Sequence, residues 1–167
     1  MKNQYGLLSK YVILGVASVW EKRKGFDDFL KLSELLNDSY RIVLVGLNDK
    51  QMKTLPQNVI GIKQTNNAEE LAGIYSMADV FLNLSVEETM GLTTIESNAC
   101  GTPAIVYNCT ALPEFINTQN GRICNIIGAN ELINSILSLT RVRYEKVRES
   151  VLQFDKIEKY KEYIQLY

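Results

Sequence analysis

The sequence predicts an α/β fold in which a doubly wound parallel sheet lies between two layers of helices, a three-layer αβα, Rossmann-like arrangement. Short runs of β-branched and aliphatic residues alternate with longer helical patterns along the whole chain. The strand-sized runs are apolar at nearly every position, which is typical of parallel strands buried on both faces. Right-handed crossovers then place helices on both faces and ligands at the carboxyl ends of the strands.

The expected strands follow these apolar runs. The first has the sequence YVILG and the second YRIVLV, and both are continuously apolar in their centres. Pro103 stands at the start of a later run, where a missing amide donor is tolerated. The expected strands span residues 11–15, 40–45, 59–62, 79–84, 103–107 and 122–124.

The expected helices fill the intervals between the strands. In the first interval Phe26, Phe29, Leu30 and Leu36 lie on one side of a helix, as an apolar stripe that can pack on a sheet. The expected helices span residues 26–36, 68–77, 92–100, 130–139 and 154–167, with a short segment at 49–52 and a further helical stretch between residues 139 and 154.

The composition indicates one globular domain over residues 1–167. A chain of 167 residues, of which 46% are hydrophobic and 22% charged, can form one full core. The net charge of −1 gives no basic balance that would indicate nucleic acid or an anionic membrane as the main partner. The three cysteines lack metal-ligand spacing, and the first residues lack the apolar segment of a signal peptide. We therefore expect a reduced, cytoplasmic location.

The complete absence of histidine narrows the chemistry further. It excludes from this chain Ser–His and Cys–His catalytic pairs, histidine-ligated zinc and a histidine general base. Any chemistry must therefore use carboxylates, lysine, arginine and backbone groups.

Residues 85–103 carry the clearest signal of a binding site. An apolar strand leads into a loop that contains Gly91, and a helix follows. Glycine at this bend allows a ligand close to the backbone, and the first amides of the helix favour an anion. Glu88 lies in the loop and Glu96 about one turn inside the helix. One carboxylate could face a neutral polyhydroxyl ligand, and the other could grip a vicinal diol such as that of ribose.

The same spacing also allows a purely structural interpretation. Thr93 and Glu96 have the spacing of a capping box, and acidic residues near a helix start are favoured by the helix dipole alone. The three consecutive cations Lys22, Arg23 and Lys24 could likewise be a solvated run of loop charges.

The motifs of this chain, taken in order, resemble those of the family-4 retaining glycosyltransferases, which have the two-domain GT-B fold. The segment ETMGLTTIE, with seven residues between its glutamates, is followed by ACGTP and a strand. The segments WEKRKGFDD, IVLVG and LAGIYSMAD precede it, and LPE, NG and FDKI follow. The resemblance covers about residues 11–167. It implies that the chain is the C-terminal, donor-binding half of a GT-B fold.

The resemblance also implies a role for each charged residue of the motifs. Glu88, the first signature glutamate, is implied to contact the donor sugar and is the candidate catalytic residue, whereas Glu96 is implied to hold the ribose hydroxyls. The loop after the first strand is implied to supply cations to the diphosphate, which singles out Lys24 with Arg23 beside it.

Backbone groups complete the implied site. The amides expected to cradle the diphosphate or the sugar hydroxyls are those of Met90, Gly91, Leu92 and Thr93. Backbone groups of Ile62 and Lys63, at the end of the third strand, are candidates for contact with the nucleobase.

Two departures from the family pattern concern this site. The usual Gly-Arg pair at the end of the first strand is absent, and the chain has GVASVW there instead. The family's Gly-Gly before Pro-Glu is replaced by Cys109, Thr110 and Ala111, which puts acceptor-side or sugar contacts at this loop in doubt.

The implied activity is retaining transfer of a glycosyl group from a UDP- or GDP-sugar to a glycan or lipid-linked acceptor, in bacterial-type polysaccharide or glycoconjugate synthesis. Front-face attack is expected, so Glu88 need not form a covalent intermediate. Cations and helix amides stabilise the leaving diphosphate without a metal, and we expect no metal and no cofactor besides the nucleotide-sugar substrate.

In relatives an acceptor-binding domain precedes the donor domain, and we expect that N-terminal domain to be absent here. The isolated donor domain is then expected to be inactive or nearly so. The acceptor, and any peripheral association with a membrane, would be reached through the missing domain. The last expected helix either crosses to that domain or packs on its own, and its apolar residues are Phe154, Ile157, Tyr160, Tyr163, Ile164 and Tyr167.

Two other functions remain open at this point. The chain could be a non-catalytic Rossmann-like nucleotide-binding or interaction module, or half of a nucleotide-sugar epimerase with the GT-B fold, whose catalytic acids would come from the other half. The loop after the first strand lacks G-x-G-x-x-G, which argues against a dinucleotide enzyme.

Overall fold

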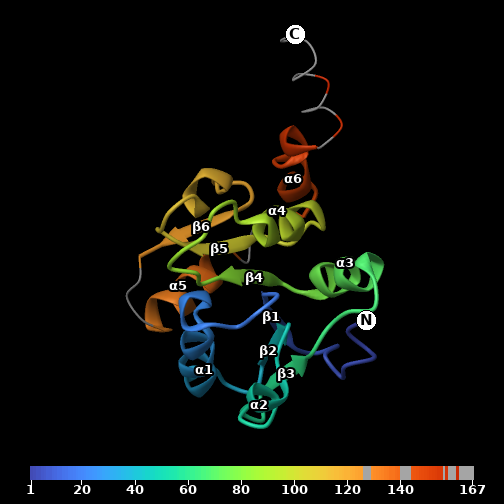
Figure 1. The fold of residues 1–167 in the computed structure, drawn as a ribbon, viewed down its shortest axis with the longest axis vertical. Coiled ribbons are helices and arrows are strands. Elements are labelled where there is room, and N and C mark those ends of the chain that lie inside the picture. The colour runs from blue at the N-terminus through green and yellow to red at the C-terminus, as the bar shows by residue number, and fades with distance from the viewer. Residues whose placement is uncertain (126–128, 140–143, 156, 158–160, 162–167) are drawn as a thin grey trace.

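A single parallel sheet organises the molecule (Figure 1). The structure, a computed structural model, describes residues 1–125, 129–139, 144–155, 157 and 161. Within these residues the sheet has six strands in the order β3-β2-β1-β4-β5-β6. They are β1 (Tyr11–Val16), β2 (Tyr40–Val45), β3 (Val59–Ile62), β4 (Val80–Asn83), β5 (Ala104–Tyr107) and β6 (Gly121–Cys124).

Helices cover both faces of the sheet, so the predicted doubly wound αβα fold is confirmed. α1 and α5 pack together on one face, and α3 and α4 pack together on the other. The helices are α1 (Phe26–Leu35), α2 (Asp49–Met52), α3 (Ala68–Met77), α4 (Leu92–Ala99), α5 (Ala129–Ser138) and α6 (Tyr144–Glu149), with 3-10 turns η1 (Lys22–Lys24), η2 (Leu112–Phe115) and η3 (Leu152–Phe154).

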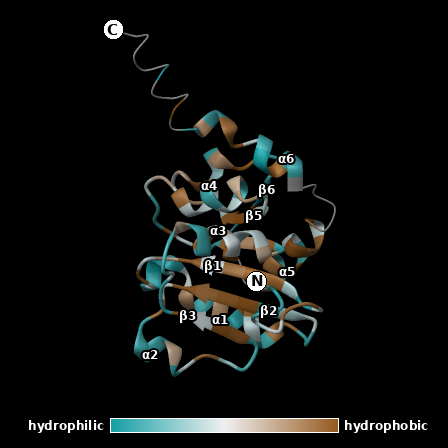
Figure 2. Ribbon diagram, turned by 90° about the vertical axis from the view of Figure 1, so that its right-hand side faces the viewer, coloured by the Kyte–Doolittle hydropathy of each residue, from teal (hydrophilic) through white to brown (hydrophobic). Residues whose placement is uncertain are grey.

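The sheet separates two apolar cores, because successive strand residues point to opposite faces. Ile13 packs with Phe29 of α1 on one face, whereas Leu14 packs with Ile74 of α3 on the other. All four side chains are buried. The strands therefore show as largely hydrophobic ribbons in Figure 2, as expected for strands covered on both sides.

The strand order places a topological switch point between β1 and β4. The chain builds β1, β2 and β3 outwards in one direction, then returns to add β4, β5 and β6 on the other side of β1. The loops that leave the carboxyl ends of β1 and β4 therefore diverge. In sheets of this kind the crevice between two such loops is where ligands bind.

At their amino ends, β1 and β4 are joined by hydrogen bonds of Asp79. The carboxylate of Asp79 accepts hydrogen bonds from the amide of Val12 and from Nζ of Lys2, each at 2.7 Å. The amide of Asp79 in turn donates to the carbonyl of Val12 at 2.9 Å. Asp79 thus fixes the entry of β4 against β1, away from the switch point.

The start of the last expected helix differs from the sequence expectation, whereas Ile157 and Lys161 are helical as expected. Phe154 belongs to the 3-10 turn η3, and its ring packs against Phe115 of the same domain at a centroid distance of 5.5 Å. Most of the helix expected over residues 154–167 lies outside the described residues, including Tyr160, Tyr163, Ile164 and Tyr167. Across the residues that are described, no helix is long and apolar enough to cross a membrane.

Candidate functional site

A small cavity of about 150 Å³ lies at the carboxyl ends of β1 and β4. Three segments form its wall: the loop after β1, the loop after β4, and the first turn of α4. The lining residues are Val16, Ala17, Ser18, Lys24, Asn83, Ser85, Glu88, Thr89, Met90, Gly91, Leu92 and Thr93. The cavity therefore occupies the switch point, where the fold favours a ligand.

Two glycines in the left-handed region let the loops approach each other. Gly25 has φ +75°, and a Cβ there would lie 2.6 Å from the carbonyl oxygen of Leu84 at the end of β4. Gly91 has φ +58° and begins α4, and a Cβ there would lie 2.9 Å from Leu112. A residue with a side chain would be strained at both positions. The loop after β1 can thus lie directly against the strand that carries the other loop.

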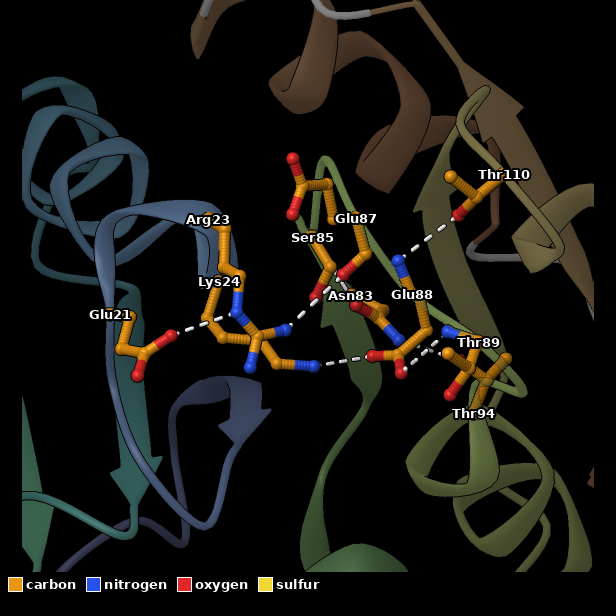
Figure 3. Close-up of polar contacts among 10 residues, drawn as sticks. All are labelled: Glu21, Arg23, Lys24, Asn83, Ser85, Glu87, Glu88, Thr89, Thr94 and Thr110. Atoms are coloured by element: carbon orange, nitrogen blue, oxygen red, sulfur yellow. Dashed lines mark hydrogen bonds and ion pairs between the residues drawn. The ribbon is translucent and has the colours of Figure 1, made fainter.

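An ion pair joins these two loops across the cavity (Figure 3). Nζ of Lys24 donates to Oε2 of Glu88 at 2.5 Å, and the two side chains are only 19% and 16% exposed. The other carboxylate oxygen of Glu88 accepts from the amide of Thr89 at 3.2 Å. The amide of Glu88 donates to Oγ1 of Thr110 at 3.1 Å. Glu88 is therefore held at its backbone and at both carboxylate oxygens.

The surroundings keep Glu88 ionised. Burial by itself raises the pKa of this carboxyl, but the hydrogen bond and the charge of Lys24 oppose it, together with the Thr89 amide and the charge of Arg23. The net effect is a pKa below the ordinary value for glutamate. At neutral pH the site thus contains a carboxylate and an ammonium group, which are good partners for hydroxyl groups and for an anion.

The start of α4 supplies backbone amides rather than a capped end. Its N-cap is Gly91, which has no side chain to cap the helix, and no side-chain cap bond forms. The capping-box interpretation of Thr93 and Glu96 is therefore wrong. The first amides of a helix have no partner within the helix, and Leu92 and Thr93, the first two residues of α4, line the cavity.

Glu96 lies one turn farther along α4, outside the lining of the cavity. Its side chain is on the surface, and Oε2 accepts a hydrogen bond at 3.0 Å from the hydroxyl of Tyr75, which is 1% exposed. Burial, together with the negative charge of Glu96, raises the pKa of Tyr75 well above its usual range. Tyr75 therefore keeps its proton and orients the carboxylate of Glu96.

The structure separates Arg23 from Lys24. Nε of Arg23 donates to Glu21 at 2.8 Å and Nη1 reaches the carbonyl of Glu87 at 3.5 Å. Arg23 and Lys22 line a different, open hollow of about 430 Å³ beside the start of α1. The run of three cations is thus partly a solvated loop surface, and only Lys24 reaches the cavity.

The nucleobase candidates lie at the edge of the sheet, at the end of β3. The carbonyl of Ile62 already accepts the amides of Gly46 at 2.8 Å and Leu47 at 3.3 Å. The ammonium group of Lys63 pairs with the carboxylate of Asp49. Neither residue lines the cavity, which the structure forms from Lys24, Glu88 and the segment Met90–Thr93.

Sequence reasoning missed three residues that hold the site together. In the sequence Tyr75 is only one position of the LAGIYSMAD passage, and Thr110 is only a departure from a glycine pattern. Asn83 ends β4 in an apolar run, yet it is buried and its Nδ2 donates to Oγ1 of Thr94 in α4 at 3.1 Å. A polar residue inside a strand-sized apolar run is the signal that could have identified Asn83.

Among the residues that the structure describes, no three His, Cys, Asp or Glu side chains lie close enough together to hold a metal ion.

Comparison with known proteins gives one family. The sequence profile described as glycosyl transferases group 1 matches residues 10–141. The chain is 28% identical over 178 aligned positions to N-acetyl-alpha-D-glucosaminyl L-malate synthase of Bacillus anthracis, covering 95% of this chain and 45% of that protein. It is 38% identical over 73 residues to a GDP-mannose-dependent alpha-(1-6)-phosphatidylinositol dimannoside mannosyltransferase of Mycobacterium tuberculosis, covering 44% of this chain and 19% of that protein.

A similar fold occurs in a solved structure. The Anabaena protein HepE, in complex with UDP-glucose, superposes with a TM-score of 0.75 at 16% identity, over 90% of this chain and 45% of that one. At this identity the likeness concerns the fold alone. The chain spans less than half the length of the curated relatives it matches.

Proposed function

This chain belongs to the glycosyl transferases group 1 family, and we propose that it is the donor-binding part of a retaining glycosyltransferase with the GT-B fold. The observation that carries the proposal is the meeting of Lys24 and Glu88 over the uncapped start of α4, at the switch point of the sheet. A cation, helix amides and a carboxylate within one cavity wall suit a ligand that has a diphosphate at one end and a sugar at the other.

The diphosphate of the donor lies at the start of α4. The amides of Met90, Gly91, Leu92 and Thr93 and the ammonium group of Lys24 contact its oxygens. A dianionic diphosphate competes with Glu88 for Lys24, so binding replaces the ion pair of the free chain by contacts with the ligand. Glu88 is then free to accept hydrogen bonds from the sugar hydroxyls.

The ribose lies toward Glu96. Its carboxylate is exposed and already oriented by Tyr75, and it can accept hydrogen bonds from both hydroxyls of a vicinal diol. Arg23 can add charge near the diphosphate only after leaving Glu21. Ile62 and Lys63 remain candidates for the nucleobase once their present partners are released.

The reaction breaks the bond between the anomeric carbon and the diphosphate oxygen, and the electron pair leaves with the diphosphate. The acceptor hydroxyl forms a new bond to the anomeric carbon on the same face and gives its proton to the departing diphosphate oxygen on that face, so the configuration is retained. Lys24 and the amides of α4 stabilise the charge that develops on the leaving diphosphate. In this proposal the step uses no metal, and Glu88 orients the sugar without a covalent intermediate.

The acceptor side is proposed to lie in a second, N-terminal domain. The curated relatives are more than twice as long as the matched region, so a preceding domain would complete the cleft and bind a glycan or lipid-linked acceptor. We infer that this chain alone turns over little, and that the whole enzyme acts in cytoplasmic synthesis of a polysaccharide or glycoconjugate. The donor is proposed to be a UDP- or GDP-sugar.

Calorimetry of nucleotide binding tests the proposal. UDP, GDP and ADP are titrated into the chain and into Glu96→Ala, with Glu34→Ala, an exposed glutamate on α1, as the matched control. We expect UDP or GDP to bind, and Glu96→Ala to weaken binding about tenfold while Glu34→Ala has no effect, since two charge-assisted hydrogen bonds are lost. Absence of binding by all three nucleotides would remove the main support and favour an interaction module.

A further inference from the structure

The turn after β5 contains an unusual backbone conformation. Thr110 has φ +49°, and it is the one non-glycine residue of the described chain with a positive φ. A β-branched residue is strained in the left-handed region, which glycine adopts freely. Strained residues of this kind persist where the surrounding structure requires them, and they gather at functional sites.

The side chain of Thr110 makes a contact that glycine could not make. Its Oγ1 accepts the amide of Glu88 at 3.1 Å, so the turn after β5 is tied to the loop after β4 (Figure 3). The two segments also touch farther along, where Gly91 packs closely on Leu112. The segment after β5 therefore contacts the loop that carries Glu88 at two points, at Glu88 and at Gly91.

The hydrogen bond between Thr110 and Glu88 lies at the candidate site and not in the hydrophobic core. Thr110 is exposed, and its hydroxyl accepts the hydrogen bond of the Glu88 backbone amide. The side chain of the same Glu88 extends toward Lys24. A hydroxyl in an exposed turn contributes little to folding, because water can replace its hydrogen bond. The hydroxyl of Thr110 instead fixes the backbone of Glu88, whose side chain reaches across the cavity to Lys24.

We propose that Thr110 is a positioning residue for Glu88, and that the hydroxyl contact is the reason for a strained backbone where glycine would fit without strain. Through Glu88, Thr110 then affects the affinity for the sugar part of the donor. This consequence rests on the proposed function. Thr110 acts through Glu88 and is not itself a catalytic residue.

Three substitutions separate the hydroxyl from the backbone strain. Thr110→Val keeps the shape and the strain but removes the acceptor. Thr110→Ser keeps the acceptor and is the rescuing variant. Thr110→Gly removes both the acceptor and the strain, so it serves as a variant that is certain to tolerate this turn.

The decisive readout is the titration of the Glu88 carboxyl in the free chain, followed by carbon-13 NMR. In Thr110→Val and Thr110→Gly we expect the pKa of Glu88 to rise toward its ordinary value, because the carboxylate loses its fixed distance to Lys24. Thr110→Ser should titrate like the wild type. Thr110→Gly should in addition melt about 2–4 °C higher, because it relieves backbone strain. An unchanged Glu88 titration in both Val and Gly variants would overturn the proposal.

Ligand binding gives a second readout that distinguishes the two proposals. Thr110→Val should weaken UDP-glucose, used as the probe, roughly fivefold more than it weakens UDP, the fold-change that corresponds to about one hydrogen bond. Equal weakening of both ligands would contradict a role in sugar binding. If no nucleotide binds to any variant, the donor function fails, yet the Glu88 titration still decides whether Thr110 positions Glu88.

Discussion

Two lysine–carboxylate pairs lie at opposite ends of the same two central strands. Lys2 and Asp79 meet at 2.7 Å beside the amino ends of β1 and β4, with side chains 27% and 22% exposed. Lys24 and Glu88 meet at 2.5 Å beside the carboxyl ends, and they are slightly more buried. Distance and exposure alone would give the two pairs the same role.

Their other contacts distinguish them. Asp79 also accepts the amide of Val12 and donates its own amide back to the Val12 carbonyl, so its pair is part of the strand backbone. Both pairs border a hollow, but the Lys24–Glu88 pair joins two loops rather than two strands, and Glu88 is braced by Thr110. The first pair stabilises the fold, whereas the second holds two charged groups where a ligand can separate them.

The largest effect is expected for Asp79→Ala. The substitution leaves the amide of Val12 without its side-chain acceptor and removes the carboxylate that pairs with Lys2, so the free energy of unfolding should fall by about 2–3 kcal/mol. The melting temperature should drop by roughly 5–10 °C for a domain of this size. Thermal unfolding followed by circular dichroism measures the change, with Asp49→Ala as an exposed control. If the melting temperature stays the same, Asp79 has no structural role.

The next effect concerns the other pair. Lys24→Met should weaken nucleoside diphosphate binding at least tenfold, or about 1.4 kcal/mol, because a direct cation contact with the diphosphate is lost. Stability should fall by about 1 kcal/mol, less than for Asp79→Ala, because Lys24 pairs with a side chain that joins two loops and its loss leaves no strand amide without an acceptor. Calorimetry and thermal unfolding together check the contrast, and Lys22→Met, a neighbour outside the cavity, is the control. If Lys24→Met lowers stability strongly but leaves nucleotide affinity unchanged, the Lys24–Glu88 pair stabilises the fold and does not mark the ligand site.

The smallest expected effect is the dependence of stability on pH through Glu88. Its pKa is lower in the folded chain than in the unfolded one, so its pair contributes stability above the unfolded pKa, about 4.3. That contribution is lost as the pH falls through the folded pKa. The difference in stability between wild type and Glu88→Gln should therefore shrink on acidification below about pH 4.5. A difference that stays constant from neutral to acidic pH would mean that Glu88 is not held ionised by Lys24.

The fold could be predicted because its signals are local. Continuous apolar runs identified the central strands, and the bounds of β2, α2, β3 and α3 agree with the expected ranges. The glutamate spacing on either side of Gly91 placed one carboxylate in a loop and the other in α4, as the structure has them. These features depend on neighbours within one or two turns of chain.

The details of the site could not be predicted, because they depend on contacts between distant segments. The turn η1 directs Lys24 inward and Arg23 outward, which three consecutive cations do not reveal. Tyr75 reaches Glu96 from α3, and Thr110 reaches Glu88 from beyond β5. The sequence shows that Thr110 stands where the family has glycine. It does not show the strained φ of Thr110 or the contact with Glu88, because both depend on tertiary packing.

Amide chemical-shift mapping tests whether the Lys24–Glu88 pair marks the nucleotide site. UDP and GDP are titrated into nitrogen-15-labelled chain, and the shifts of assigned amides are followed. We expect saturable shifts at Lys24, at Glu88 and at residues 91–94, with none at Lys2, Val12 or Asp79. Saturable shifts centred on the amino ends of the strands, or none at the carboxyl ends, would contradict it.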